Sequence, residues 1–229
     1  MRTMSTWSIA FTAAVLFTVA GTAASEEKSI GLMNSLEVKQ LVARGEPGDN
    51  ARLSAHFSAL ADRFTAEATR HTSMSQSFAG NPSRSLGTGM STHCKQLADL
   101  NTQSATTARE LSAYHGQLAG GTPATMPRDA ARFHEGAGAP EPTGKELNAL
   151  AASAKTRAEH KALEEYFLTL SKRYSTEANE HVALAQTYRG TKIAQAAVHH
   201  DRLAALARDS AKEATAAAEM HKQLADVAR

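Results

Sequence analysis

The sequence predicts an all-α protein, a duplicated helical hairpin that forms an antiparallel, up-down-up-down four-helix bundle. Three observations support this class. The composition favours helix, because Ala, Leu, Glu, Lys and Arg are abundant and aromatic residues make up only 5% of the chain. Apolar residues recur at steps of three and four over long stretches, the spacing of a buried helical stripe. Finally, one half of the chain repeats the other.

The repeat is visible at a constant spacing of 110 residues, which pairs Glu67 with Glu177. After a shorter second turn, the match resumes at a spacing of 106, so that Cys94 corresponds to His200. Because both arms and the turn between them recur, each copy is expected to be a complete hairpin. Two hairpins most simply form one bundle; two hairpins that pair with other chains are the alternative. We therefore expect a monomer or a homodimer.

The first 25 residues have the pattern of a secretory signal peptide. Arg2 supplies a positive start, residues 9–20 are mostly apolar, and small residues offer cleavage near Ala24 or Ser25. A retained membrane anchor is the alternative, but the apolar stretch is short beside the ~20 residues that span a bilayer. We expect an exported, periplasmic protein with no stable membrane span after cleavage.

The first repeat, residues 26–120, should hold a short helix and a hairpin. The short helix is expected over residues 36–42, where a brief apolar pattern occurs. Pro47 suits the first position of the outgoing helix, and Gly80 suits its end. After a longer turn, the return helix is expected over residues 90–119.

A linker rich in Gly, Pro and Ala, residues 121–144, separates the repeats. In the second repeat, residues 145–229, Thr156 and Glu159 have the spacing of a capping box at a helix start. Gly190 should end that outgoing helix. The two remaining helical segments are expected over residues 147–154 and 192–227.

The charge balance argues against nucleic acid as a partner. The chain has 25 Lys and Arg against 23 Asp and Glu, and the two signs are interspersed. Without a basic block there is no electrostatic footprint for nucleic acid. No nucleophile elbow, phosphate loop or zinc-protease motif occurs either, so we do not expect an enzyme.

Polar residues lie inside the expected buried stripes, at equivalent places in both repeats. Glu67 and His71 are one turn apart on the outgoing stripe, and their counterparts recur in the second copy. Burying an unpaired polar group costs several kcal/mol, roughly 2–7. On the return helices His93 and His199 are expected in the core. Counting from each hairpin turn places them level with the outgoing histidines, so two sets of candidate ligands emerge: Glu67, His71, His93, Cys94 and Glu177, His181, His199, His200.

Imidazoles flanked by a carboxylate or a thiol are the ligands of transition metals. The expected function is therefore an exported bundle that binds copper or zinc for buffering, carriage or sensing, with noncovalent haem as a less favoured variant. If both hairpin turns lay at one end of the bundle, the two sets would approach each other and allow a dinuclear site. Met74 and Met90, close to the first set, would suit Cu(I).

A structural role is the alternative. Glu and His spaced by four residues can satisfy each other, and buried polar residues in a bundle can serve only to fix helix pairing. The protein would then be a structural or adaptor component of the cell envelope. His160 comes level with His221 at the far end of the second hairpin, where local hydrogen bonding is the favoured interpretation. Cys94 is the single cysteine, so no internal disulfide forms.

Overall fold

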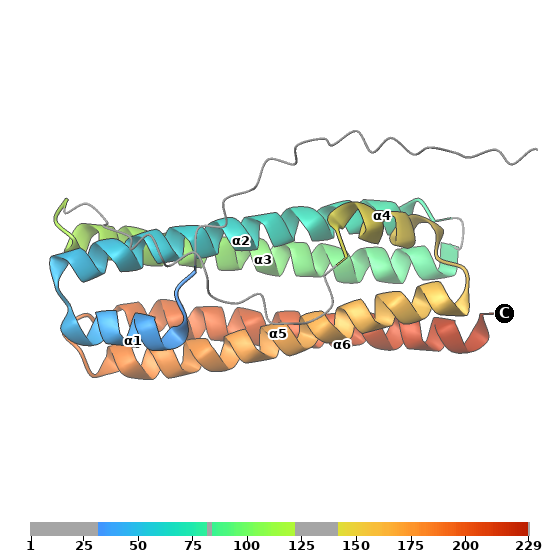
Figure 1. The fold of residues 1–229 in the computed structure, drawn as a ribbon. Helices are drawn as coiled ribbons and strands as arrows, with labels where there is room; N and C mark the ends of the chain where they lie inside the picture. The colour runs from blue at the N-terminus through green and yellow to red at the C-terminus, as the bar shows by residue number, and fades with distance from the viewer. Residues whose placement is uncertain (1–31, 82–83, 122–141, 229) are drawn as a thin grey trace, which may run out of the picture.

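Four long helices run side by side in a computed structural model that describes residues 32–81, 84–121 and 142–228 (Figure 1). Helix, and no strand, is found over these residues, as the sequence predicts. The long helices are α2 (Pro47–Ala79), α3 (Arg84–Leu118), α5 (Arg157–Arg189) and α6 (Ala196–Val227), and two short ones are α1 (Ser35–Arg44) and α4 (Gly144–Ser153). The signal-like stretch and most of the Gly- and Pro-rich linker lie outside the described residues.

The outgoing helices begin and end where their local signals predict. The hydroxyl of Thr156 accepts a hydrogen bond from the Glu159 N–H, and the Glu159 carboxylate accepts one from the Thr156 N–H, which together form a capping box. Helix α2 starts on Pro47 and stops before Gly80. The return helices differ from expectation: α3 begins at residue 84 rather than 90, and α6 at residue 196 rather than 192.

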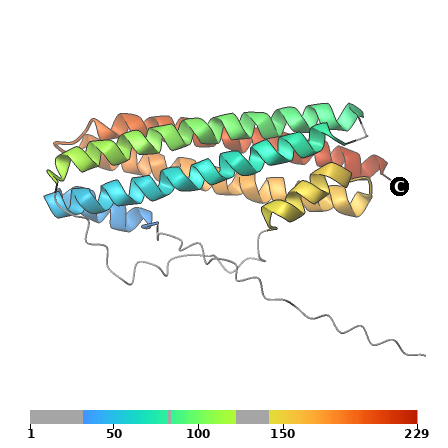
Figure 2. The same ribbon diagram turned by 90° about the horizontal axis from the view of Figure 1, so that it is seen from above.

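The short helix of each repeat begins with a capping box. Asn34 and Glu37 form a capping box at α1, and Thr143 and Glu146 form one at α4. Both short helices lie on the side of the bundle formed by α2 and α5, towards opposite ends (Figure 2). Each contacts both of these long helices, so the short helices cover the two ends of the α2–α5 face.

The chain order of helix directions differs from the expected up-down-up-down. The α2–α3 turn lies at one end of the bundle and the α5–α6 turn at the other (Figure 1). Helices α2 and α6 therefore run one way and α3 and α5 the other, an up-down-down-up order with one long crossover. The neighbours in the bundle are α2 with α3, α5 with α6, α3 with α6, and α2 with α5. Each of these pairs joins helices of opposite direction, so every neighbouring pair is antiparallel, as expected.

Two reciprocal ion pairs explain this orientation. Arg63 Nη2 lies 2.9 Å from Glu177 Oε1, and Arg173 Nη2 lies 2.8 Å from Glu67 Oε1. These four residues are two pairs of repeat partners, so the same contact is made twice, as across a two-fold axis. The hairpins thus point in opposite directions (Figure 1). Cys94 lies in the apolar cluster beside α4, whereas His200 packs on Phe57 in the cluster beside α1. The expected dinuclear site, with both hairpin turns at one end and all the imidazoles together, therefore does not form.

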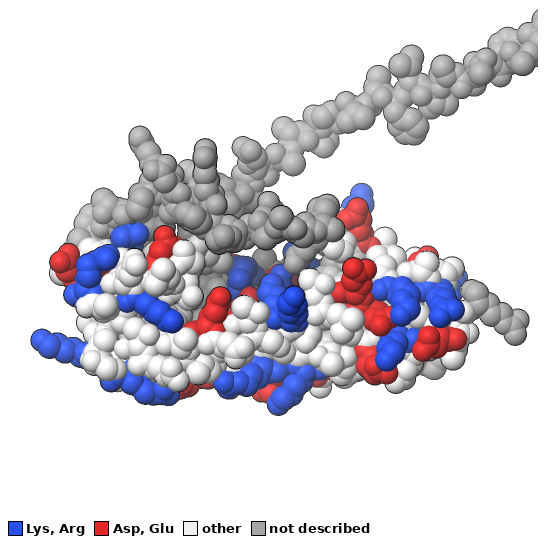
Figure 3. All heavy atoms as spheres, turned by 60° about the horizontal axis from the view of Figure 1, so that its bottom comes forward, with Lys and Arg blue, Asp and Glu red and all other residues white. Residues whose placement is uncertain are grey.

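The core divides into two apolar clusters, one towards each end. Phe57, Leu184 and Tyr188 belong to the cluster beside α1, whereas Met74 and Phe167 belong to the cluster beside α4. Outside the core, positive and negative side chains are interspersed on the face shown in Figure 3. Within the described part of the chain, no helix has an apolar stretch long enough to cross a membrane.

Candidate functional site: buried histidines at both ends of the bundle

Histidine is concentrated in the core of this bundle. Histidine as a residue type is only intermediate in its tendency to be buried. Here most of the described histidines are buried, and two lie partly at the surface. Such a core has to be explained by pairing or by a ligand. The buried histidines are His56, His71, His115, His160, His181, His200 and His221.

The two histidines outside the core are His93 and His199, which corrects the expected core positions. Their neighbours Cys94 and His200 are fully buried instead. The physical reason is that consecutive residues in an α-helix point about 100° apart. A stripe assigned one residue too early therefore places the flanking residue inside and the inward residue on the flank. His93 contacts the carboxylate of Glu213, and the matching surface histidine pairs with a carboxylate of α3. Within the described residues, no hydrogen bond or ion pair joins either of them to another member of its expected set.

Each hairpin has an inner histidine place, one turn from its buried glutamate, and an outer place towards the open end of the hairpin. The inner place of the second hairpin holds the imidazoles of His181 and His200 in direct contact. The Nδ1 atoms of His181 and His200 are 3.1 Å apart. His200 Nε2 is buried with no hydrogen-bond partner among the described residues, and the ring stacks on Tyr188 at 5.0 Å between centroids. Burial lowers the pKa of His181 to about 3, and burial followed by the neighbouring His181 lowers that of His200 well below its ordinary value. Both rings are therefore neutral at pH 7.

The inner place of the first hairpin holds His71 and Cys94, the repeat partners of those two histidines. Both side chains are fully buried. Neither ring nitrogen of His71 has a hydrogen-bond partner among the described residues. Burial lowers the pKa of His71 to about 4, although Glu67 opposes this, and burial raises the pKa of the Cys94 thiol to about 12. This place too is uncharged at neutral pH.

The outer places of the two hairpins hold equivalent histidines, His115 in the first repeat and His221 in the second. His115 is fully satisfied: its Nδ1 lies 2.8 Å from Asn50 Oδ1 and its Nε2 lies 2.9 Å from the hydroxyl of Tyr188. At the opposite end, its repeat partner His221 has its Nδ1 3.3 Å from His160 Nδ1. His221 Nε2 has no hydrogen-bond partner among the described residues.

The two outer places differ at two positions: the amide of Asn50 is replaced by the imidazole of His160, and the hydroxyl that satisfies His115 Nε2 is missing beside His221. The residue that corresponds to Tyr188 is Phe78, whose ring lies 5.6 Å from that of His221. The sequence reasoning did not identify Asn50 and Tyr188 as members of a site. The available signal was the repeat itself, which aligns Asn50 with His160 and Tyr188 with Phe78.

The two expected carboxylate ligands, Glu67 and Glu177, lie in the middle of the bundle and pair with arginines. Burial would raise the pKa of Glu67, but Arg173 and then Arg70 outweigh it and lower that pKa. For Glu177 burial dominates over Arg63 and raises the pKa. Glu177 Oε2 is buried and has no hydrogen-bond partner among the described residues, so it is the carboxylate oxygen that remains available beside His181.

A small pocket gives access to this carboxylate from the surface. It has a volume of about 110 Å³ and lies beneath α1. Its polar lining residues are Ser35, His56, Arg63, Glu177, Glu180 and His181, and the others are apolar. His56 Nδ1 accepts a hydrogen bond of 3.1 Å from the N–H of Met33, which ties the segment before α1 to the pocket wall. Of the pair His181 and His200, it is His181 that lines this pocket.

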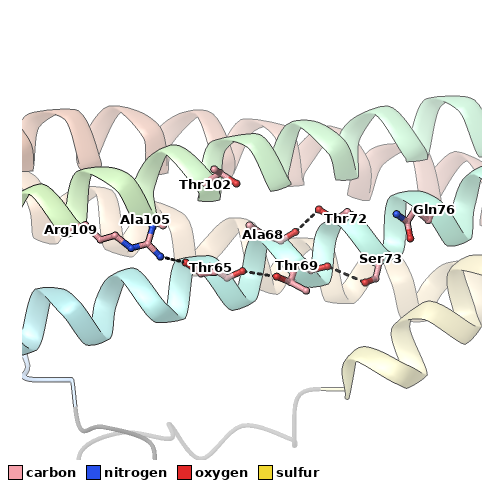
Figure 4. A pocket seen from close by; sticks show the side chains of 9 residues that line it. All are labelled: Thr65, Ala68, Thr69, Thr72, Ser73, Gln76, Thr102, Ala105 and Arg109. Carbon is pink, nitrogen blue, oxygen red and sulfur yellow. Dashed lines mark hydrogen bonds between the residues drawn. The ribbon is translucent and has the colours of Figure 1, made fainter.

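A larger groove of about 390 Å³ lies between α2 and α3 and has a different character (Figure 4). Small hydroxyl side chains line it, and they bond within the protein: Thr65 and Thr69 donate to backbone carbonyls one turn earlier. Arg109 is its one charged lining residue, and it donates to the Thr65 hydroxyl at 2.8 Å. The groove brings together no groups that could perform acid–base chemistry or bind a metal.

The histidine places are pairs and not complete coordination shells. Among the described residues, no three His, Cys, Asp or Glu side chains lie close enough together to hold a metal ion. Each pair offers two neutral donors, and further ligands would have to come from a small movement, from methionine sulfur or from water. No protein-family model matches the chain, and neither a curated protein nor a solved structure matches it.

Proposed function

We propose that this protein binds a transition metal ion, copper or zinc, at its paired buried imidazoles, and that it buffers, carries or senses that ion outside the cytoplasm. The observation that supports this best is the distance between facing nitrogens, 3.1 Å for His181 with His200 and 3.3 Å for His160 with His221. Two nitrogens that bind one tetrahedral zinc at ~2.0–2.1 Å lie about 3.3 Å apart. The spacing therefore fits a shared ion as well as an N–H···N hydrogen bond.

The protonation state supports the same proposal. An imidazole must be neutral to ligate a metal, and burial keeps these rings neutral well below pH 7. For the His181 place, Glu177 Oε2 would supply a third ligand after a small movement, and the pocket beneath α1 would admit the ion. Haem is less well supported, because its plane would have to separate two imidazoles that are in contact.

The proposed location rests on the N-terminal sequence. Residues 1–25 have the charge, apolar and small-residue pattern of an export signal, which would deliver the protein to the periplasm. A bundle with internal imidazole pairs would be suited to buffering or carrying metal ions there.

A structural or adaptor role is the second candidate, and one observation favours it. His115 uses both nitrogens on protein partners, so at least one buried histidine acts only in packing. If His181 and His200 do the same through an N–H···N bond, their replacement by apolar residues should be neutral or stabilising.

Thermal melting with and without zinc separates the two. The full chain is stripped with EDTA and melted with increasing Zn²⁺, alongside a His181→Leu, His200→Leu variant and a matched His93→Leu, His199→Leu variant of the surface histidines. Binding predicts a rise in Tm for the wild type and the surface variant, by mass action about 2.7 kcal/mol of stability at 100 times Kd. The core variant keeps the His160–His221 pair and should lose the part of the rise that comes from the His181–His200 pair. An unchanged zinc response in the core variant, or none in any protein, would contradict the proposal.

A further inference from the structure

Among the buried histidines that the structure describes, His71 is the one whose two ring nitrogens both lack a hydrogen-bond partner. The side chain is fully buried. A neutral imidazole always carries one N–H donor and one lone pair, so both functions are unmet here. Its repeat partner, His181, has an imidazole against it. An unpartnered, wholly buried ring is a reason to look for a ligand.

The register of the hairpins identifies what faces His71. Ser75 donates to the backbone carbonyl of Ser91, which sets α2 against α3 one turn from this place. Ser171 donates to the carbonyl of Ala211 and sets α5 against α6 in the corresponding register. In the position where the second hairpin has His200, the first hairpin has Cys94. The two inner places are therefore built alike, with a thiol in one and an imidazole in the other.

Two thioethers lie within a turn of this pair. Met74 follows His71 by three residues, Met90 precedes Cys94 by four, and both are buried in the same apolar cluster as the cysteine. At the positions equivalent to Met74 and Met90 the second hairpin has leucine and alanine, so its inner histidine place has no matching thioethers. The methionine of α6, Met220, packs against the cluster of the first hairpin's sulfur residues. One imidazole, one thiol and two thioethers form a mainly soft set of donors. The carboxylates that act on this set, Glu67 on His71 and Glu213 on Cys94, pair with Arg173 and His93.

We infer that His71, Cys94, Met74 and Met90 form a Cu(I) site, distinct from the imidazole pairs and selective for a soft monovalent ion; this rests on the proposed metal-binding function. Binding breaks the S–H bond of Cys94 and forms a Cu–S bond, the proton leaves to solvent, and copper stays monovalent. The bound ion and the thiolate together are neutral, which suits an apolar surrounding. Without metal, burial keeps the thiol protonated and therefore unreactive.

The test uses the full chain under anaerobic conditions, with Cu(I) supplied as its coloured bicinchoninate complex. The wild type should withdraw one equivalent of copper into this site. Cys94→Ala should weaken that uptake at least tenfold, and Met74→Leu, Met90→Leu together should weaken it by a similar factor. His93→Ala, on the neighbouring surface position, is the matched control and should bind as the wild type does. Circular dichroism confirms that each variant is helical, and Cys94→Ser serves if the alanine variant does not fold.

Parallel zinc titrations distinguish the two proposals. If zinc responds to His181 and His200 but copper uptake is the same in the Cys94 and methionine variants, the Cu(I) site is refuted and the imidazole pairs remain. If neither zinc nor copper binds, the proposed function is refuted as well. Copper loss that follows Cys94 and the methionines, with zinc binding unchanged, supports the assignment.

Discussion

Acidification should unfold this protein well above the pH at which its carboxylates protonate. The buried histidines have lower pKa values in the fold than in the unfolded chain, because burial penalises the charged ring. Between those two values the unfolded chain binds more protons. Stability is therefore full above pH ~6.5 and falls as the pH drops towards the folded-state values.

The size of the effect follows from the individual shifts. Burial lowers the pKa from 6.5 to about 4 for three histidines and to about 3 for two more, as found for His56, His71, His115, His181 and His221. At pH 5, about 1.5 below the ordinary value, each of the five costs about 2 kcal/mol at ~1.36 kcal/mol per pH unit. Together they remove about 10 kcal/mol, which is comparable with the ~5–15 kcal/mol stability of a typical domain. His200 acts in the same direction.

Helical circular dichroism, followed from about pH 8 to pH 4 in EDTA, measures this directly. We expect a cooperative loss of helix with a midpoint between about pH 5 and pH 6. His71→Leu removes one of the titrating groups and no hydrogen bond, so its midpoint should lie at lower pH. The surface variant His93→Leu should leave the midpoint unchanged. Full helicity at pH 4, or one midpoint for all three proteins, would refute the reasoning.

Three further substitutions are expected to change stability, each measured by chemical denaturation at pH 7.5 in EDTA. Tyr188→Phe leaves the Nε2 of His115 without its partner and should cost about 1–3 kcal/mol; no loss would mean that this bond is not formed. Phe78→Tyr places a hydroxyl near the unpartnered Nε2 of His221 and should stabilise by about 0.5–1.5 kcal/mol, whereas destabilisation would argue against equivalence of the two ends. Thr156→Ala removes a helix cap and should cost about 1 kcal/mol, and an unchanged midpoint would contradict the capping box.

Local signals in the sequence predicted the outgoing helices well. A proline at the first position, the capping box of Thr156 with Glu159, and a glycine after the last residue each act within one turn. The repeat predicted that both halves would be built alike. The start of α6 was missed because residues 191–195 form turns, although their composition also suits a helix.

The pattern of apolar residues could not predict how one hairpin is oriented against the other. Both orders bury the same apolar stripes, and the choice depends on contacts between residues far apart, such as Arg63 with Glu177. The assignment of His93 and His199 to the core failed for a related reason. Two adjacent polar residues on a helix differ by one rotation of about 100°, and spacing alone did not show which of them turns inward.

The most direct test of metal binding is an anomalous difference map at the zinc edge from crystals of the full chain grown with zinc. The proposal predicts a peak between the imidazoles of His181 and His200, with a second between His160 and His221. Peaks confined to the surface histidines His93 and His199, or none at all beside well-defined imidazole pairs, would contradict it.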